Sequence, residues 1–300
     1  MLMIGVGQAG KNIVKLFKPH TKNYKIIILD EDEGIAKQDT VEKYDEQSIK
    51  LTQRGLKSHS EAFLFVCGSG KIAGASLRVL EALKAFKTTV VYIVPDLEFA
   101  SECEQKRHRV HFGILQEYAR SGLVRELIIF DNKTLFEHAG TGTTLKYYEK
   151  VNYFIYSTIQ NLMYCNHVKP DFGKLHEKKE ISRISTIGMA KLEEKEKLLF
   201  SLDNITETCY IIDIDEEDLD NDESIIPKCQ QIVRDNKEKN RDTSFAIWKS
   251  SEDNHFFSIH STHYIQEWKF NGGWPWTKTR KYWGRLRETK KNFSTQKKQS

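Results

Sequence analysis

Three glycines follow an apolar run at the start of this chain, and they constrain its fold more than any other feature. The first fourteen residues read MLMIGVGQAGKNIV, with Gly5, Gly7 and Gly10 ahead of a helical pattern. Glycines at this spacing let the backbone turn tightly from a strand into a helix and approach another group closely. The N–H groups and the positive dipole end of such a helix attract a phosphate. The sequence therefore predicts a nucleotide site on a strand-to-helix turn.

Apolar runs alternate with helical patterns through the first 135 residues. This alternation is typical of an α/β fold with a parallel sheet covered on both faces. Ligands of such sheets bind at the carboxyl ends of the strands, where the glycine turn lies. The expected strands are Met1–Val6, Tyr24–Leu29, Ala62–Val66, Thr88–Val94 and Leu127–Phe130, and the expected helices are Lys11–Phe17, Ala75–Phe86 and Glu102–Ala119.

The pattern changes near residue 145. The stretch YYEKVNYFIYSTIQNLMYCN is apolar on most faces, which predicts a helix over about Leu145–Asn166 buried between two units. Further strands are expected at Ile181–Met189, Thr208–Ile214, Thr243–Lys249 and Phe256–His260, with a helix at Ile225–Asn236. The expected organisation is a parallel-sheet nucleotide-binding domain (1–144), a central helix and loop (145–178), a smaller α+β domain (179–264) and a tail (265–300).

Charge and cysteine content narrow the class of protein. The chain carries a net charge of +4, but the segment Trp268–Ser300 alone carries +9, which leaves a mildly acidic body. The five cysteines are scattered without a CxxC pair, which favours neither a zinc ribbon nor a disulfide framework and fits a reducing cytoplasm. We expect no signal peptide and no membrane span, because no apolar run approaches the length that either needs.

A second glycine-rich turn, Gly68–Ser76, also follows an expected strand and precedes an expected helix. Two such turns on one sheet edge can hold a polyphosphate from two sides. It is not a P-loop, because Lys71 is followed by Ile72 rather than Ser or Thr. The alternative is a tight turn that serves helix packing alone.

A colinear set of motifs over about Met1–Tyr264 resembles the tubulin/FtsZ family of self-assembling GTPases. The N-terminal motifs are IGVGQAGKN, Lys50–Leu56, Gly68–Ser76 and Asp131–Lys133, and the later ones are Tyr148, Asn152 and Gln160 of the long helix and the loop Lys169–Phe172. The segments ISRISTIGMA and CYIIDIDEEDLDNDESIIPKCQQIVRDN resemble the family's assembly domain. The resemblance implies a protein that binds GTP or GDP with Mg²⁺ and polymerises with copies of itself. Hydrolysis of GTP is then expected on contact with the next subunit.

The resemblance also implies roles for individual residues. Phosphate contacts are expected from Gly5, Gly7, Gln8, Ala9, Gly10, Asn12, Gly68, Ser69, Gly70, Lys71 and Gly74. On the base side, Asn132, Tyr148 and Asn152 fall where the family contacts guanine and its ribose, while Glu102 and Lys106 match a nucleotide-contacting Glu and Arg. Asp32 lies where an acid helps to hold Mg²⁺ through water, and no side chain is expected to bind a metal directly. Asp171 matches a catalytic acid that orients water in the neighbour's site.

Departures from the family pattern predict weakened hydrolysis. The family has Thr and Gly where this chain has Lys71 and Ile72, and the side chain of Ile72 is a steric obstacle to a phosphate. Lys174 stands in place of a second catalytic acid. The loop that senses the γ-phosphate has no counterpart after Leu56. A nucleotide-independent scaffold of the same fold is therefore an alternative to an active GTPase.

Other residues have competing interpretations. Asp30 lies twenty residues after Gly10, the spacing of a dinucleotide fingerprint, so an NAD-dependent oxidoreductase is a rival hypothesis. Glu102 and Lys106 are equally well explained as an i,i+4 ion pair on an exposed helix. His108 and His111 are expected to face solvent. The basic, Trp-rich tail Trp268–Ser300 could bind an anionic membrane surface, an adaptor protein or nucleic acid.

Overall fold

The computed structural model describes residues 1–20, 24–41, 43, 59–139, 146–192, 194–237, 241–250 and 254–267. Met1–Gln266 forms one compact unit, and Glu267–Ser300 is assigned to a second. The motif Lys50–Leu56 and the tail segment Trp268–Ser300 lie outside the described residues. All that follows concerns the first unit.

Parallel strands build the first half of the sheet. Strands β1 (Leu2–Val6), β2 (Lys25–Leu29), β3 (Glu61–Cys67), β4 (Lys87–Val94) and β5 (Glu126–Asp131) lie in the order β2-β1-β3-β4-β5. Each neighbouring pair in this series is parallel. These strands are rich in Val, Ile and Phe and most of their residues are buried, as a sheet covered on both faces requires. The predicted parallel sheet is confirmed.

Helices follow these strands, and two of their boundaries differ from the expected ones by four residues. They are α1 (Gly7–Leu16), α2 (Ala75–Ala82), α3 (Glu102–Ser121) and α4 (Asn132–Ala139). Helix α1 begins at Gly7 rather than Lys11, so the glycine turn is itself the first turn of the helix. Helix α2 ends four residues before Phe86. Helix α4 was missed, because it follows β5 without an intervening turn signal.

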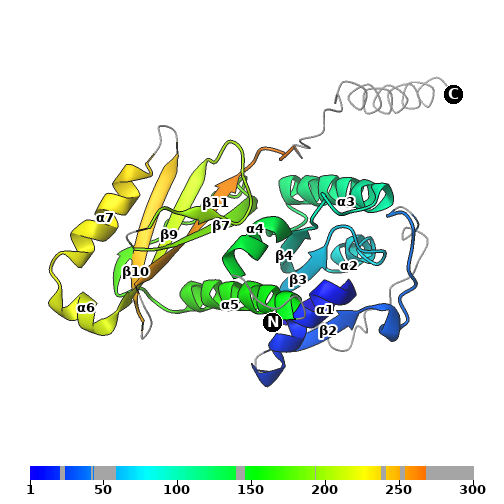
Figure 1. Cartoon of the computed structure of the whole chain (residues 1–300), viewed down its shortest axis with the longest axis horizontal. Coiled ribbons are helices and arrows are strands. Elements are labelled where there is room, and N and C mark those ends of the chain that lie inside the picture. The colour runs from blue at the N-terminus through cyan, green and yellow to red at the C-terminus, as the bar shows by residue number, and fades with distance from the viewer. Residues whose placement is uncertain are drawn as a thin grey trace. The chain divides into compact units, whose positions relative to one another are not determined.

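The sheet continues without a break into the second half. Strand β7 (Ile184–Lys191) runs parallel to β5, with Leu127 opposite Ile184. Beyond it lie β11 (His255–Thr262), β9 (Glu207–Asp215), β10 (Asp242–Ser250) and the short β6 (Phe172–Lys174), while β8 (Lys197–Leu198) pairs with β7. Helices α6 (Glu216–Asn221) and α7 (Ile225–Asp235) complete this part. Within the described residues the sheet has eleven strands. Figure 1 shows it continuing from β2 in the first half to β10 in the second.

Three short elements of this half escaped prediction, for local reasons. Helix α6 has the sequence EEDLDN and no apolar stripe, so hydrophobic periodicity gives no helix signal there. Its start is capped instead by the side chain of Asp215, which accepts a hydrogen bond from the N–H of Glu217. Strand β6 is exposed and exists only because it pairs with β10, and β8 is two residues long.

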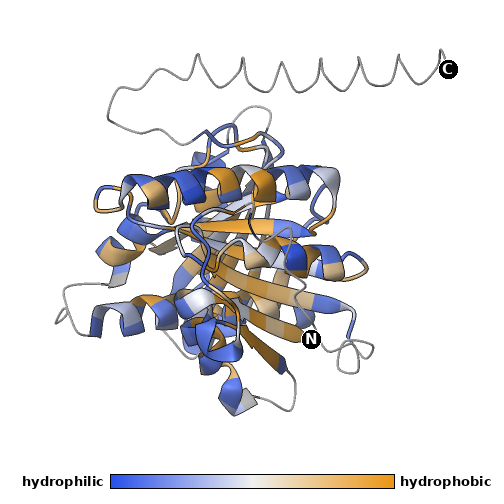
Figure 2. Ribbon diagram, turned by 90° about the vertical axis from the view of Figure 1, so that its right-hand side faces the viewer, coloured by the Kyte–Doolittle hydropathy of each residue, from blue (hydrophilic) through white to orange (hydrophobic). Residues whose placement is uncertain are grey.

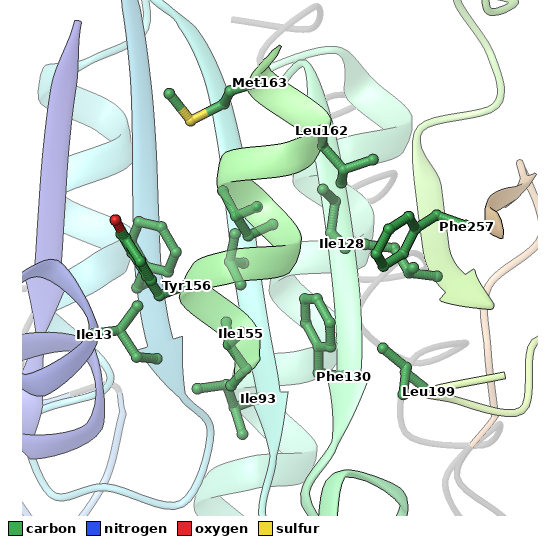
Figure 3. Packing of buried hydrophobic residues seen from close by; sticks show 14 of the residues in the cluster. Ile13, Ile93, Ile128, Phe130, Ile155, Tyr156, Leu162, Met163, Leu199 and Phe257 are labelled. Atoms are coloured by element: carbon green, nitrogen blue, oxygen red, sulfur yellow. The ribbon is translucent and has the colours of Figure 1, made fainter. Parts of the chain in front are cut away.

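Helix α5 (Tyr147–His167) confirms the predicted long helix, but it lies across one face of the sheet with only one side buried, because Tyr148, Tyr153 and Tyr164 are exposed. Ile155 and Tyr156 pack with Ile13 and Ile93 of the first half, and Leu162 points towards Phe257 of the second (Figure 3). Burial of one such side chain is worth about 1.5–3 kcal/mol. One apolar cluster therefore joins both halves through α5.

The opposite face of the sheet has its own cover. In the first half, Tyr92 of β4 packs against Phe112 of α3, with ring centroids 5.2 Å apart. In the second half, Ile225 and Cys229 of α7 pack on Tyr210 and Ile212. The hydropathy colouring shows apolar strands inside helices whose outer faces are polar (Figure 2). Among the described helices, none combines the length and apolar character needed to cross a membrane.

Candidate nucleotide site

The first glycine turn combines close packing with one open position. A Cβ atom on Gly10 would overlap the carbonyl oxygen of Phe65 in β3, so this glycine lets α1 approach the sheet. Gly7, in contrast, has φ +66°, the left-handed region that favours glycine, and only the Cβ of Ile72 comes within 4.0 Å of the position its own Cβ would take. Val6 provides no side-chain cap for the helix start. The backbone N–H groups at the start of α1 therefore receive no hydrogen bond from a capping side chain.

A depression of about 850 Å³ lies beside this helix, between α1, α4 and α5. Its lining includes Asn12 of α1, His138 of α4 and Asn152 of α5. The Nε2 group of Gln8 donates a hydrogen bond to the side-chain Oδ1 of Asn12 over 3.1 Å, which orients the Asn12 amide. The fold therefore brings together three residues that the sequence predicted as nucleotide contacts, Gln8, Asn12 and Asn152.

Aromatic side chains gather at the start of α5. The ring of Tyr147 lies 4.8 Å from that of Phe136 and 4.9 Å from that of Tyr148. Tyr148 is 66% exposed, so one face of its ring is available for stacking on a flat ligand. The Tyr147 hydroxyl donates to the carbonyl oxygen of Asn132 over 3.5 Å, which ties α4 to α5 at this point. Tyr148 and Asn132 thus lie on the elements that border the depression.

The second glycine turn is closed by its own packing. Ile72 is 4% exposed, and hydrogen bonds from the N–H groups of Ala73, Ala75 and Ser76 stay within the turn. A Cβ on Gly68 would overlap the Tyr92 hydroxyl and lie 2.8 Å from Nδ1 of His108. These contacts favour the helix-packing interpretation for this turn. Four other residues of this turn were expected to contact phosphate. Gly74 is buried, Ser69 and Gly70 lie in the turn, and the ammonium of Lys71 lies 3.9 Å from Oδ1 of Asp39.

Arg107 holds the second turn, although no sequence motif points to it. Its guanidinium is buried, and its Nε donates to the carbonyl oxygen of Ser69 over 2.9 Å. A second bond reaches the carbonyl oxygen of Asp39 at 3.3 Å. The neighbouring Lys106, which was assigned to the nucleotide, instead pairs with Glu102 over 2.6 Å on the exposed face of α3. Successive residues of α3 point in different directions, so Arg107 faces the turn whereas Lys106 faces solvent. A short motif match does not take this difference into account.

His108 and His111 do not face solvent, contrary to the expectation. Both are at most 1% exposed. Nδ1 of His108 bonds the Tyr92 hydroxyl at 2.8 Å, and Nε2 of His111 bonds the Ser76 hydroxyl at 2.7 Å. Burial lowers the pKa of each imidazole to about 3, with a smaller contribution from a neighbouring positive charge. Both rings are therefore neutral and support the second turn from below.

Lys11 forms ion pairs with the acidic residues that follow β2. Its ammonium lies 3.0 Å from Oδ2 of Asp30 and also contacts Oδ2 of Asp32. The hydrogen bonds to Asp32 and Asp30 raise the pKa of Lys11, and Lys11 in turn lowers the pKa of Asp32. The Asp30 carboxylate is nearly buried, so the acid that the NAD hypothesis requires is already bound. Oδ2 of each carboxylate already accepts from Lys11, and no cluster of three metal-binding side chains occurs within the described ranges.

Asp171 lies at the opposite end of α5 from the depression. Its N–H donates to the carbonyl oxygen of Ile247, and its Oδ2 accepts from the N–H of Lys249, both over 2.9 Å. Two bonds to β10 thus fix the carboxylate at the edge of the sheet. Lys174, three residues after Asp171, is exposed on β6. The structure therefore separates this residue from the expected nucleotide contacts of the same chain.

Solved structures of three proteins are similar to most of this chain. FtsZ of M. jannaschii has 12% identity and a TM-score of 0.65, with 91% of this chain and 94% of that chain covered. CetZ of Methanosaeta thermophila has 13% identity and a TM-score of 0.58, with coverages of 98% and 96%. TubZ of Bacillus thuringiensis, in a GTPγS-form protofilament, has 14% identity and a TM-score of 0.60, with coverages of 100% and 94%.

These likenesses establish the fold, which is that of tubulin and FtsZ, and they confirm the predicted α/β class. TubZ has also been solved as GDP-form protofilaments and as a two-stranded filament. No family model and no curated protein matches the sequence.

Proposed function

We propose that this chain binds GTP or GDP and assembles head-to-tail into cytoskeletal filaments. One observation carries the proposal. Asn12 and Asn152, from helices 140 residues apart in the sequence, line one depression that runs along the second half of α1, and Asn12 lies five residues after Gly7, the first residue of that helix. The depression would take the base, and the helix start would take the phosphates.

The amide of Asn152 supplies the specificity in this proposal. A side-chain amide both donates and accepts hydrogen bonds, so it matches the mixed donor and acceptor edge of guanine. Tyr148 would stack on the ring of the base. Gly7 leaves space for a phosphate. The nearest side-chain atom to the position of a Cβ on Gly7 is the Cβ of Ile72, at 4.0 Å.

Nucleotide binding is tested by titrating the protein with a fluorescent GTP analogue. Asn152→Ala removes the proposed base contact, and we expect affinity to fall about tenfold or more, the usual cost of a lost buried hydrogen bond. Asn166→Ala is the matched control: it lies on the same helix, is exposed and is about 20 Å further along the axis. Equal affinities for wild type and Asn152→Ala would refute the proposed base contact.

The geometry of α5 supports assembly through copies of the chain. Its 21 residues span about 30 Å, with the depression at its start and Asp171 beyond its end. One chain cannot apply its own Asp171 to its own nucleotide, but a second copy stacked on the first could. Such a heterologous contact does not close on itself, and therefore produces a filament.

Sedimentation with GTP, with GDP and without nucleotide tests the assembly. Pelleting that depends on GTP would support a nucleotide-controlled filament of this chain. We expect phosphate release to be slow, because a single acid, Asp171, orients water while Lys174 carries the wrong charge for that role. Asp171→Asn should abolish phosphate release, and Lys174→Asp should increase it. Phosphate release unchanged in Asp171→Asn would remove this residue from the reaction.

The closed second turn favours one alternative function. Because Ile72 is packed where a second phosphate loop was expected, a nucleotide-independent scaffold of the same fold is the second candidate. Pelleting to the same extent under all three conditions would support it. Absence of pelleting in every condition would refute self-assembly in both forms.

A further inference from the structure

Lys11 lies one helical turn after Gly7, on the helix whose start forms the proposed phosphate site. Its side chain is only 12% exposed, and its stem is therefore held against the protein. The ammonium contacts two carboxylates, Asp30 and Asp32. A lysine at this position was not assigned any function from the sequence.

The two acidic partners of Lys11 differ in their exposure. Asp30 has a side chain 10% exposed, whereas Asp32 is 75% exposed. The contact to Asp30 thus anchors the ammonium, while the contact to Asp32 is open to exchange with a ligand in solvent. A lysine ammonium has three donors on a flexible stem, so it can keep Asp30 and take a phosphate oxygen in place of Asp32.

A divalent cation does not fit the same place. Mg²⁺ requires nearly octahedral oxygen ligands and gives up its waters reluctantly. Here the carboxylate oxygens nearest to α1 already accept from an ammonium, and that positive charge repels a second cation at short range. The described part of the chain offers no other cluster of acidic, histidine or cysteine ligands.

We propose that Lys11, anchored by Asp30, is the built-in cation of the phosphate site, so that the chain binds nucleoside di- and triphosphates without Mg²⁺. This inference rests on the proposed nucleotide-binding function and replaces the metal expected from the sequence. Lys11 neutralises phosphate charge in the role that a bound metal commonly fills. The freed Asp32 then faces solvent.

The test compares the affinity for a fluorescent GTP analogue in excess Mg²⁺ and in EDTA. Wild type should bind equally in the two media, within about threefold. Lys11→Met keeps the apolar stem and removes the charge; its affinity in EDTA should fall about tenfold or more, and Mg²⁺ should restore part of the loss because Asp30 and Asp32 become available. Lys15→Met, exposed one turn further along α1, is the matched control and should behave as wild type.

The double variant Lys11→Met/Asp30→Asn guards against misfolding, because it leaves no unpaired buried charge. It should melt cooperatively and still show the loss in EDTA, without recovery in Mg²⁺. A tenfold or greater loss of wild-type affinity in EDTA would overturn the inference and leave the proposed function standing. Absence of binding in both media, for a folded wild type, would overturn the inference and nucleotide binding together.

Discussion

The two glycine-rich turns look alike in the sequence but differ in the folded protein. Both join a parallel strand to a helix on the same edge of the sheet. In the first, Gly7 stays open in a left-handed conformation, and the helix start has no side-chain cap. In the second, Ile72 is buried and Arg107 binds the carbonyl oxygen of Ser69. The same residue pattern thus leaves a glycine uncovered in one place, where we propose that phosphate binds, and is filled by packing in the other.

The difference depends on what faces each glycine. Gly10 and Gly68 lie against a backbone carbonyl and a buried tyrosine, respectively, whereas Gly7 and Gly70 do not meet such obstacles. Gly5 is packed as tightly as Gly10, because its Cβ would overlap the carbonyl oxygen of Gly10. Each turn therefore contains at least one glycine that close packing requires and one that is sterically free. The following predictions separate these classes, and they are ordered by the size of the effect.

Gly10→Ala should have the largest effect, a destabilisation of about 3 kcal/mol, because its Cβ would overlap a strand carbonyl that cannot move without displacing the sheet. Gly70→Ala is the control from the second turn. Its Cβ would lie 3.6 Å from the carbonyl oxygen of Cys67, an ordinary contact, so stability should change by less than about 0.5 kcal/mol. Urea unfolding measures both. Similar losses for the two variants would contradict the packing difference.

Acid should weaken the support beneath the second turn. His108 and His111 have a pKa of about 3 in the folded state, below the unfolded value of 6.5. The unfolded chain therefore binds more protons between pH 3 and 6.5, and the stability held above pH 6.5 is lost as the pH falls through this window. We expect a loss of about 2 kcal/mol between pH 6.5 and 5.5, about 1 kcal/mol for each ring. Stability in His108→Gln/His111→Gln should be flatter over the same interval; an unchanged slope would assign the acid sensitivity to other groups.

Gly7→Ala should reduce stability by only about 1 kcal/mol, the cost of a left-handed alanine with no steric overlap. Its effect on nucleotide affinity should exceed its effect on folding, because the methyl group would project towards the proposed phosphate site. Thermal melting and analogue titration of one preparation give both values. A loss of stability without loss of affinity would exclude Gly7 from the binding site.

Lys106→Ala should produce the smallest effect, with no measurable change in melting temperature, since its ion pair with Glu102 is exposed. Nucleotide affinity then decides between the two interpretations of this residue. Unchanged affinity would establish the pair as a surface feature of α3. Reduced affinity at unchanged stability would restore Lys106 to the proposed site.

The sequence predicted the strands of the parallel sheet, the long central helix and the order of the elements. These features follow from local periodicity, which the chain displays residue by residue. Elements with weak local signals were missed: β6 owes its existence to pairing with β10, and α6 lacks an apolar stripe. Only some of the residues expected to contact the nucleotide lie near one another in the structure, among them Gln8, Asn12 and Asn152.

By itself, the sequence determined that two glycine turns lie at the carboxyl ends of strands, because strand order and turn spacing are written into the chain. Only the tertiary structure decided which glycine stays open, that His108 and His111 are buried, and that Lys11 reaches Asp30. Each of these facts depends on contacts between segments remote in the sequence. Burial and charge pairing are properties of those contacts, and no local pattern encodes them.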